Sequence, residues 1–249
     1  MNTLSPLATL FVLTIGLILP ILAWRSGRRL TAAPAAADAG SSPAGPTLSR
    51  RTYYVSAFVT QATTLGFALL VAREVGMPLF GPVRVEPLAW LATLAVFAGL
   101  LATLPMRWRT RAPAQRRRHA ELAPRTPLQA LANIALCLTA GVGEEITYRG
   151  VLHGCLWWLT GSWWIATVAC SLSFGVAHAI QGRRSMLIIA GVAFWMHVTV
   201  LWTGSLHLAM FVHAAYDLIA TFTIAKSVAR DEASEALAVA PAARTQDRG

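Results

Sequence analysis

Residues 127–161 read PLQALANIALCLTAGVGEEITYRGVLHGCLWWLTG, an almost uninterrupted apolar run of 35 residues. Such a run is too long to cross the ~30 Å apolar core of a bilayer as one straight helix. Gly141 and Gly143 lie near its middle. We therefore expect either a helix break at these glycines or a long tilted helix whose first half lies at the membrane interface.

The composition of the whole chain agrees with a membrane protein. Of its 249 residues, 55% are hydrophobic and only 13% are charged, and the mean hydropathy is +0.54. Soluble domains carry about 25% charged residues. The fold class predicted from this composition is all-α, a polytopic transmembrane helical bundle.

Apolar runs of membrane-spanning length predict about seven crossings. The first run lacks the basic segment of a signal peptide, so we expect it to be a membrane helix and not a cleaved leader. The predicted crossings are 4–24, 53–72, 87–106, 127–161, 163–180, 186–203 and 206–225.

These crossings divide the chain into three parts. Residues 1–126 form the N-terminal helices and include an Ala/Pro/Gly/Ser-rich stretch at 31–49, which is typical of a flexible linker. Residues 127–225 form the C-terminal group of membrane helices. Residues 226–249 are expected to be a mobile cytoplasmic tail.

The net charge of +10 comes from arginines between the apolar runs. Residues 25–51 hold five arginines and residues 107–125 hold seven, each with a single acid. Basic loops face the cytoplasm in membrane proteins. This pattern predicts a plasma-membrane protein with its N-terminus outside and its C-terminus in the cytoplasm. It also argues against nucleic acid as a partner, because no nucleic-acid-binding motif accompanies the charge.

Charged residues inside the apolar region mark a candidate site, because charge at membrane depth is costly and usually functional. Glu145 and Arg149 are four residues apart and can pair along one helix face. Glu144 points about 100° away from Glu145 and lacks an evident partner. Alternatively, both acids lie at the water boundary and are simply solvated.

Two histidines on later predicted helices each have a potential partner four residues away in the sequence. Phe174 precedes His178 by four residues, and His213 precedes Asp217 by four. An acid at this spacing can hold the tautomer and orientation of a histidine ring. Each histidine taken alone is more often a core residue than a catalyst. Together with Glu144, they place one polar site on each of three apolar helices.

These residues resemble the CPBP family, which includes the type II CAAX prenyl proteases, the Abi proteins and the bacteriocin-processing enzymes. The three motifs read EEITYR at 144–149, FGVAH at 174–178 and HAAYD at 213–217. The resemblance covers about residues 127–225. Asp217 stands where prenyl proteases usually have Asn, and an ionised Asp cannot donate a hydrogen bond.

The resemblance implies an intramembrane endopeptidase that opens to the cytoplasmic side. Glu144 would be the general base, and His178 would help it to activate a water. His213, oriented by Asp217, would stabilise the oxyanion. Support for the site would come from Glu145, Arg149 and Phe174.

A zinc-dependent version of this site would use the same side chains as ligands. Glu144, His178 and His213 could complete a His₂Glu zinc site with an open position for water. The HExxH motif of many zinc proteases is missing from the sequence. Both the metal-free and the Zn²⁺ mechanism therefore stay open at this point.

The expected partners are the lipid bilayer and a membrane-associated peptide or protein, either CAAX-type and prenylated or bacteriocin-like. Two other functions are consistent with polar residues in membrane helices. One is a non-catalytic, immunity-type membrane protein that binds a peptide, and the other is a proton or ion carrier. Carriers often contain inverted repeats, and this sequence shows none.

Overall fold

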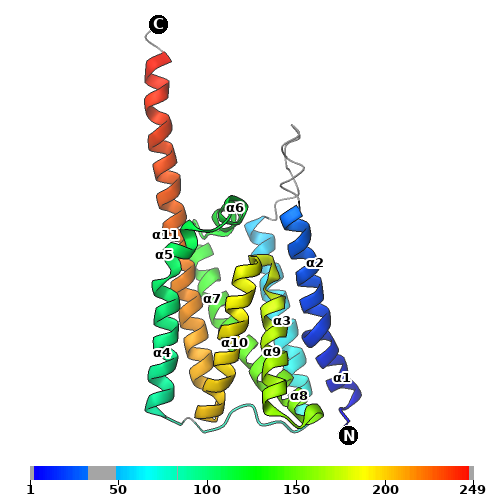
Figure 1. Cartoon of the computed structure of the whole chain (residues 1–249). Helices are drawn as coiled ribbons and strands as arrows, with labels where there is room; N and C mark the ends of the chain where they lie inside the picture. Colours follow the sequence, from blue (N-terminus) through cyan, green and yellow to red (C-terminus); the bar gives the residue numbers. More distant parts are fainter. Residues whose placement is uncertain (1–2, 33–48, 83, 247–249) are drawn as a thin grey trace.

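The structure is a computed structural model that describes residues 3–32, 49–82 and 84–246. Within these ranges the chain forms helices joined by short connections, with no strand (Figure 1). The predicted linker at 31–49 lies almost entirely outside the described residues. The elements are α1 Pro6–Leu13, η1 Thr14–Ile18, α2 Leu19–Ala32, α3 Arg50–Glu74, α4 Pro87–Ala102, α5 Leu104–Arg109, α6 Pro113–Leu122, α7 Pro127–Glu144, η3 Glu145–Leu152, α8 His153–Thr160, α9 Trp163–Ala177, η4 Ala179–Gln181, α10 Arg183–Thr203 and α11 His207–Gln246.

Six helices within the described ranges are long and apolar enough to cross a membrane. They are Pro6–Arg28, Arg50–Glu74, Pro87–Arg109, Pro127–Thr160, Arg183–Thr203 and His207–Ser234. The predicted crossing at 163–180 is the shorter apolar helix α9. The polytopic helical bundle predicted from the sequence is therefore confirmed, with six long helices and one short one.

The outer surface of the bundle is apolar. Leu70, Leu88, Leu91, Leu128 and Leu187 are each more than 60% exposed. These residues come from helices on different sides of the bundle, so the exposure is not confined to one patch. Such a surface suits lipid, because hydrocarbon tails solvate leucine side chains as well as a protein core does.

The helix that contains the acidic pair has no break at the glycines. It continues from Pro127 to Thr160 and changes to π-helical hydrogen bonding from Glu145 to Leu152. Of the two predicted alternatives, a long continuous helix is therefore the one observed. A π-helical segment inserted in an α-helix is often found at a functional site.

Both glycines allow neighbouring helices to approach α7 closely. A Cβ atom at Gly141 would lie 2.7 Å from Ala214 Cβ on α11. A Cβ atom at Gly143 would lie 3.4 Å from Gln61 Oε1 on α3. The missing side chain of Gly141 therefore sets how closely α7 packs against α11, whereas a Cβ at Gly143 would make only ordinary contact with α3. Neither glycine interrupts the helix.

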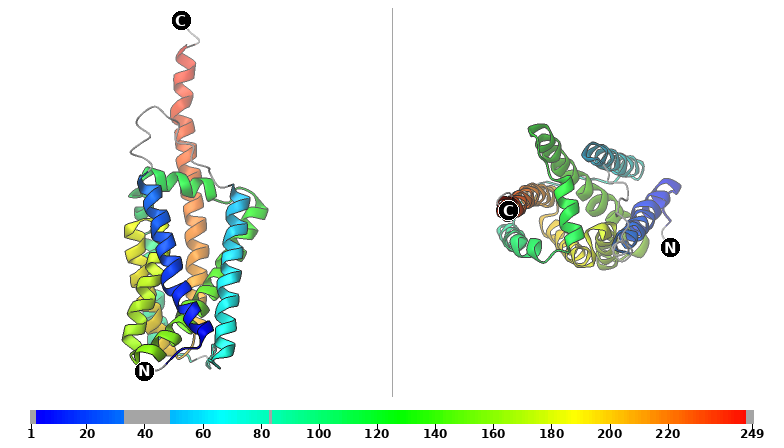
Figure 2. Two further views of the ribbon diagram at one scale, coloured as in Figure 1. Left: turned by 90° about the vertical axis from the view of Figure 1, so that its right-hand side faces the viewer. Right: turned by 90° about the horizontal axis from the view of Figure 1, so that it is seen from above.

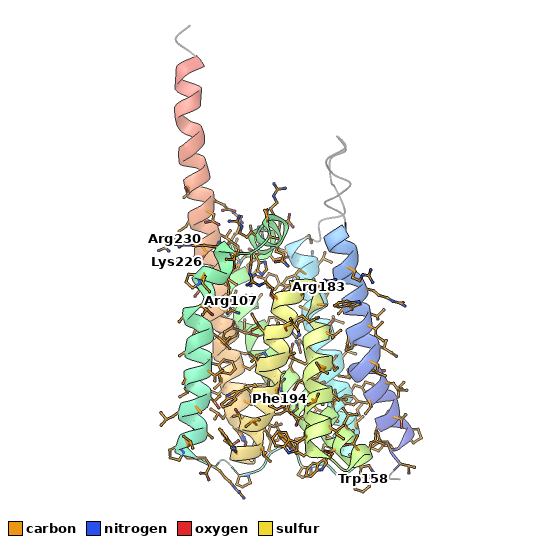
Figure 3. All side chains as sticks on the ribbon, in the orientation of Figure 1. Arg107, Trp158, Arg183, Phe194, Lys226 and Arg230 are labelled. Carbon is orange, nitrogen blue, oxygen red and sulfur yellow. The ribbon has the colours of Figure 1, made fainter. Side chains whose placement is uncertain are left out.

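The two ends of the bundle differ in their side chains. The short helix α6 lies across one end, and α11 extends beyond the bundle at that same end (Figures 1 and 2). Arg107, Arg183, Lys226 and Arg230 lie toward this end, whereas Trp158 lies at the other (Figure 3). We call the first the basic end of the bundle. The N-terminal helix α1 starts at the opposite end.

The C-terminal helix is longer than predicted. The last crossing was expected to end near residue 225, but α11 continues to Gln246. At the basic end it is attached to the bundle by a hydrogen bond from Trp108 Nε1 to Asp231 Oδ2 of 3.0 Å. Arg125 also pairs with Glu232 there. The first part of the predicted tail is thus a docked helix.

Candidate active site

The acidic pair lies at the junction between α7 and η3. Glu144 is the last residue of α7 and Glu145 is the first of η3. The side chain of Glu144 is 18% exposed, whereas that of Glu145 is fully buried. The two neighbouring carboxylates therefore occupy different environments, as their spacing on the helix predicted.

Glu145 is the centre of a buried charged group. Its Oε1 lies 3.2 Å from Arg149 Nη1 and 2.7 Å from His213 Nδ1. The arginine contact is an ion pair by distance but lacks hydrogen-bond alignment, since Nη1 has no hydrogen-bond partner among the described residues. The Arg149 guanidinium also stacks over the Phe174 ring, 4.5 Å from its centre. Removing one partner of such a buried pair costs about 3–5 kcal/mol.

His213 is held through its Nδ1 atom. That atom donates to Glu145 Oε1, so the ring makes its short hydrogen bond with Glu145 and not with Asp217. Asp217 Oδ2 lies 3.6 Å from the other ring nitrogen, Nε2, and Glu144 Oε2 lies 3.9 Å from it. The Nε2 atom therefore faces the two other carboxylates of the site.

His178 sits at the C-terminal end of α9, and its ring is fixed by its own helix. Its Nδ1 donates to the Phe174 carbonyl over 2.8 Å, which leaves Nε2 as the nitrogen available to a ligand. The rings of Phe174 and His178 are 4.6 Å apart. Gly175 allows this helix end to approach α10, because a Cβ there would lie 2.8 Å from the Met186 carbonyl oxygen.

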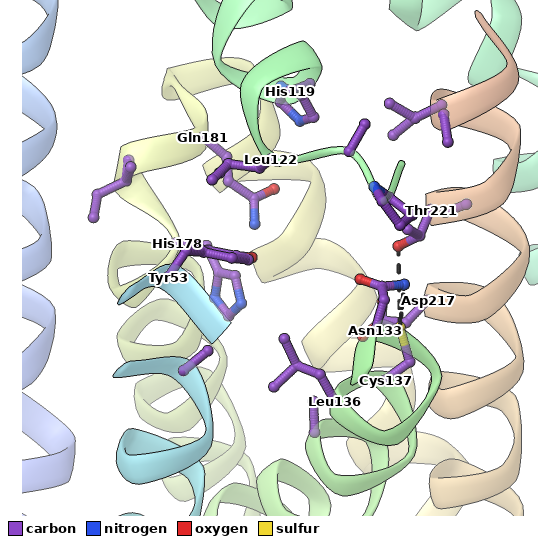
Figure 4. Close-up of a pocket in the computed structure, with 18 of the residues that line it drawn as sticks. Tyr53, His119, Leu122, Asn133, Leu136, Cys137, His178, Gln181, Asp217 and Thr221 are labelled. Atoms are coloured by element: carbon purple, nitrogen blue, oxygen red, sulfur yellow. Dashed lines mark hydrogen bonds between the residues drawn. The ribbon is translucent and has the colours of Figure 1, made fainter. Parts of the chain in front are cut away.

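Two cavities meet at these side chains. The larger has a volume of about 800 Å³ and the smaller about 190 Å³. Figure 4 shows the larger one, with His178 and Tyr53 on one side, Asp217 on the other and His119 of α6 above. The residues that line both cavities are Arg111, Glu144, His178, Gln181, Tyr216 and Asp217.

Positive charge lies at the basic end of the smaller cavity. Arg107 and Arg111 both line it. Arg107 donates to Tyr216 Oη over 2.8 Å. Burial lowers the pKa of the Arg111 guanidinium, and the nearby Arg107 guanidinium lowers it further. The cavity thus has carboxylates and histidines in the bundle interior and guanidinium groups near its end.

Sequence reasoning did not identify Gln61 of α3 as a site residue. Its Nε2 donates to Glu144 Oε1 over 2.6 Å. A signal was present in the polar residues that recur on one face of a predicted membrane helix. Those that line the larger cavity are Tyr53, Ser56, Thr60 and Gln61.

The described residues do not fit a metal centre. No three His, Cys, Asp or Glu side chains among them are grouped so that they could hold a metal ion. In the His213 ring, Nδ1 is occupied by Glu145, so Nε2 is the nitrogen left for a ligand. The zinc ligand set of Glu144, His178 and His213 is therefore not assembled in this structure.

Comparison with known proteins identifies one family. Residues 126–219, somewhat less than half of the chain, match the model of the type II CAAX prenyl endopeptidase Rce1-like family. This segment holds all three motifs and runs from the start of α7 into α11. No curated protein and no solved structure matches the chain.

Proposed function

We propose, from the match of residues 126–219 to the type II CAAX prenyl endopeptidase Rce1-like family, that the chain is an intramembrane endopeptidase that cleaves a membrane-associated peptide or protein. The observation that carries this proposal is the meeting of Glu144, His178, His213 and Asp217 from three helix regions where two cavities join. Peptide hydrolysis needs a base, a positioned water and an oxyanion donor. In this proposal Glu144 is the base, His178 positions the water and His213 is the oxyanion donor.

In the proposed mechanism, Glu144 acts as the general base. Its Oε1 is engaged by Gln61, so its Oε2 is the oxygen available to take a proton from a water. The His178 Nε2 atom would orient this water, because Nδ1 is held by the Phe174 carbonyl. The resulting hydroxide attacks the scissile carbonyl. Glu144 then passes its proton to the departing amine, so that one water is consumed per peptide bond.

His213 is the proposed donor to the tetrahedral oxyanion. Only in its protonated form can this ring donate from both nitrogens at once. Glu145 would hold Nδ1–H, and Nε2–H would face the oxyanion. Asp217 would accept from Nε2–H when no substrate is bound, because its carboxylate already lies 3.6 Å away. This gives Asp217 a role at the position where prenyl proteases usually have Asn.

The proposed substrate enters the larger cavity from the basic end of the bundle. A volume of about 800 Å³ falls in the range of ~300–1,000 Å³ that is usual for ligand sites. α6 residues line the cavity, so it extends to that end of the bundle. We place this end in the cytoplasm and the N-terminus outside the plasma membrane, following the arginine distribution. The substrate would be a CAAX-type prenylated or bacteriocin-like peptide.

The test is a comparison of new protein termini in membranes from cells that express the wild type or Glu144→Gln at equal levels. Termini that form only with the wild type are the expected result and would also identify the substrate. Identical termini in the two samples would contradict the proposal and favour a peptide-binding protein. Proton or ion flux in vesicles that carry the purified chain would indicate a carrier instead.

A further inference from the structure

Helix α3 lies outside the segment that matches the family, yet it forms one wall of the larger cavity. Tyr53, Ser56, Thr60 and Gln61 of α3 all line it. The spacing of three, four and one residues places them on one face of the helix. α3 packs against both α7 and η3, the two elements that carry Glu144 and Glu145. The cavity is therefore not complete within residues 126–219.

The contact between Gln61 and Glu144 is short and specific. Gln61 Nε2 donates to Glu144 Oε1 over 2.6 Å, slightly shorter than the ~2.7–2.9 Å usual for charge-assisted N–H···O hydrogen bonds. Gly143, next to Glu144, faces the same part of α3. A side chain there would begin 3.4 Å from Gln61 Oε1 and 3.7 Å from Leu65 Cβ.

The other half of the Gln61 amide costs stability. Its Oε1 is buried and has no hydrogen-bond partner among the described residues. Leaving a buried acceptor unpaired is unfavourable, whereas an apolar side chain of similar shape avoids that penalty. Gln61 is therefore poorly explained as a stabilising residue, and its N–H donor to Glu144 is the part with a use.

We propose that Gln61 is a positioning residue for the general base, and that α3 is part of the catalytic unit. By holding Oε1, the amide fixes the Glu144 carboxylate so that Oε2 faces the cavity and His213. Without this donor, the carboxylate is free to rotate out of this orientation, in which Oε2 lies 3.9 Å from His213 Nε2. This inference rests on the proposed function, because it assigns Gln61 to the same reaction.

The first test is the kinetics of Gln61→Leu, which removes the donor and keeps an apolar side chain of similar bulk. We expect kcat to fall about ten- to a hundredfold, the range for a lost hydrogen bond to a charged group, with KM unchanged. Gln61→Glu should lose at least as much, because it places a like charge against Glu144. The matched control is Gln129→Leu, which changes an amide that accepts from Arg125 N and lines neither cavity.

Unchanged kcat in Gln61→Leu, beside an inactive Glu144→Gln, would overturn the positioning role and leave the protease assignment intact. Full activity of Glu144→Gln would instead remove the proposed function. Thermal unfolding, which does not depend on catalytic activity, tests the contact between Gln61 and Glu144 in that second case. The shifts in thermal unfolding midpoint for Gln61→Leu, Glu144→Ala and the double variant should be non-additive, because each single change removes the one hydrogen bond that the two residues share. Additive shifts would overturn the proposal whatever the activity.

Discussion

Replacing Gly141 by alanine should disable the site without changing any side chain that performs chemistry. The added Cβ would lie 2.7 Å from both Cβ and N of Ala214 and 2.8 Å from its Cα. Ordinary contact between such atoms begins near 3.5 Å. α7 and α11 must therefore separate by roughly 1 Å, and Ala214 is the residue directly after His213.

That separation acts on the hydrogen bond between His213 Nδ1 and Glu145 Oε1. The bond is 2.7 Å long, and about 1 Å more takes it beyond the usual hydrogen-bond range. A displacement of about 1 Å at a catalytic group can lower the rate about a hundredfold. Overpacking also costs about 1–3 kcal/mol of stability, partly offset by the better helix propensity of alanine.

The assay is the rate of peptide cleavage together with the thermal unfolding midpoint in detergent. Gly66→Ala and Gly191→Ala are matched controls, because a Cβ at either position meets nothing within 4 Å. We expect both controls to be as active as the wild type. Ala214→Gly should restore Gly141→Ala only in part, since the Ala214 backbone atoms still obstruct the new Cβ. Wild-type activity and stability in Gly141→Ala would refute this account of how the two helices set the site.

Three further predictions concern the charged group, the metal question and the orientation. Arg149→Met should lower the free energy of unfolding by about 3–5 kcal/mol because it removes the arginine that pairs with the buried Glu145 carboxylate. Glu144→Gln should lower it much less, because Glu144 is more exposed. Equal destabilisation of the two variants in calorimetry would contradict this difference between the two acids. Peptide cleavage should survive treatment with a zinc chelator followed by dialysis, and loss of activity that zinc alone restores would show that a metal centre forms. A cysteine introduced at Ser234 should react with an impermeant maleimide only from the cytoplasmic side. The three native cysteines are buried and should add little background labelling. Labelling of intact cells from outside would contradict the proposed orientation.

The elements that the sequence predicted well depend on local patterns. Apolar runs of sufficient length located the membrane helices, and the four-residue spacing of Glu145 and Arg149 corresponds to an observed ion pair. The spacing of Phe174 and His178 also has a physical basis, because the Phe174 carbonyl accepts from the His178 ring. Each of these contacts lies within one helix, where the separation along the chain fixes the separation in space.

The features that the sequence did not predict depend on partners far away in the chain. Gly141 and Gly143 suggested a break because nothing local showed that Ala214 and Gln61 would pack against them. The ring of His213 was assigned to Asp217 by spacing, yet Glu145 on another helix makes the shorter contact. Gln61 belongs to no motif, and its only signal was the row of polar residues on one face of its helix. Its contact with Glu144 depends on how α3 packs against α7, which no short pattern encodes.

The change from α- to π-helical bonding at Glu145 determines the angular phase of the long helix. Before it, α7 faces α3 and α11, and after it, α8 faces α9 and α1. One residue corresponds to about 100° of rotation in an α-helix. Deleting one residue from 146–148 would therefore turn α8 against α7 by roughly that angle. The two acids would keep their places at the end of α7, but Arg149 would stand three residues after Glu145, and α8 would present another face to α9 and α1.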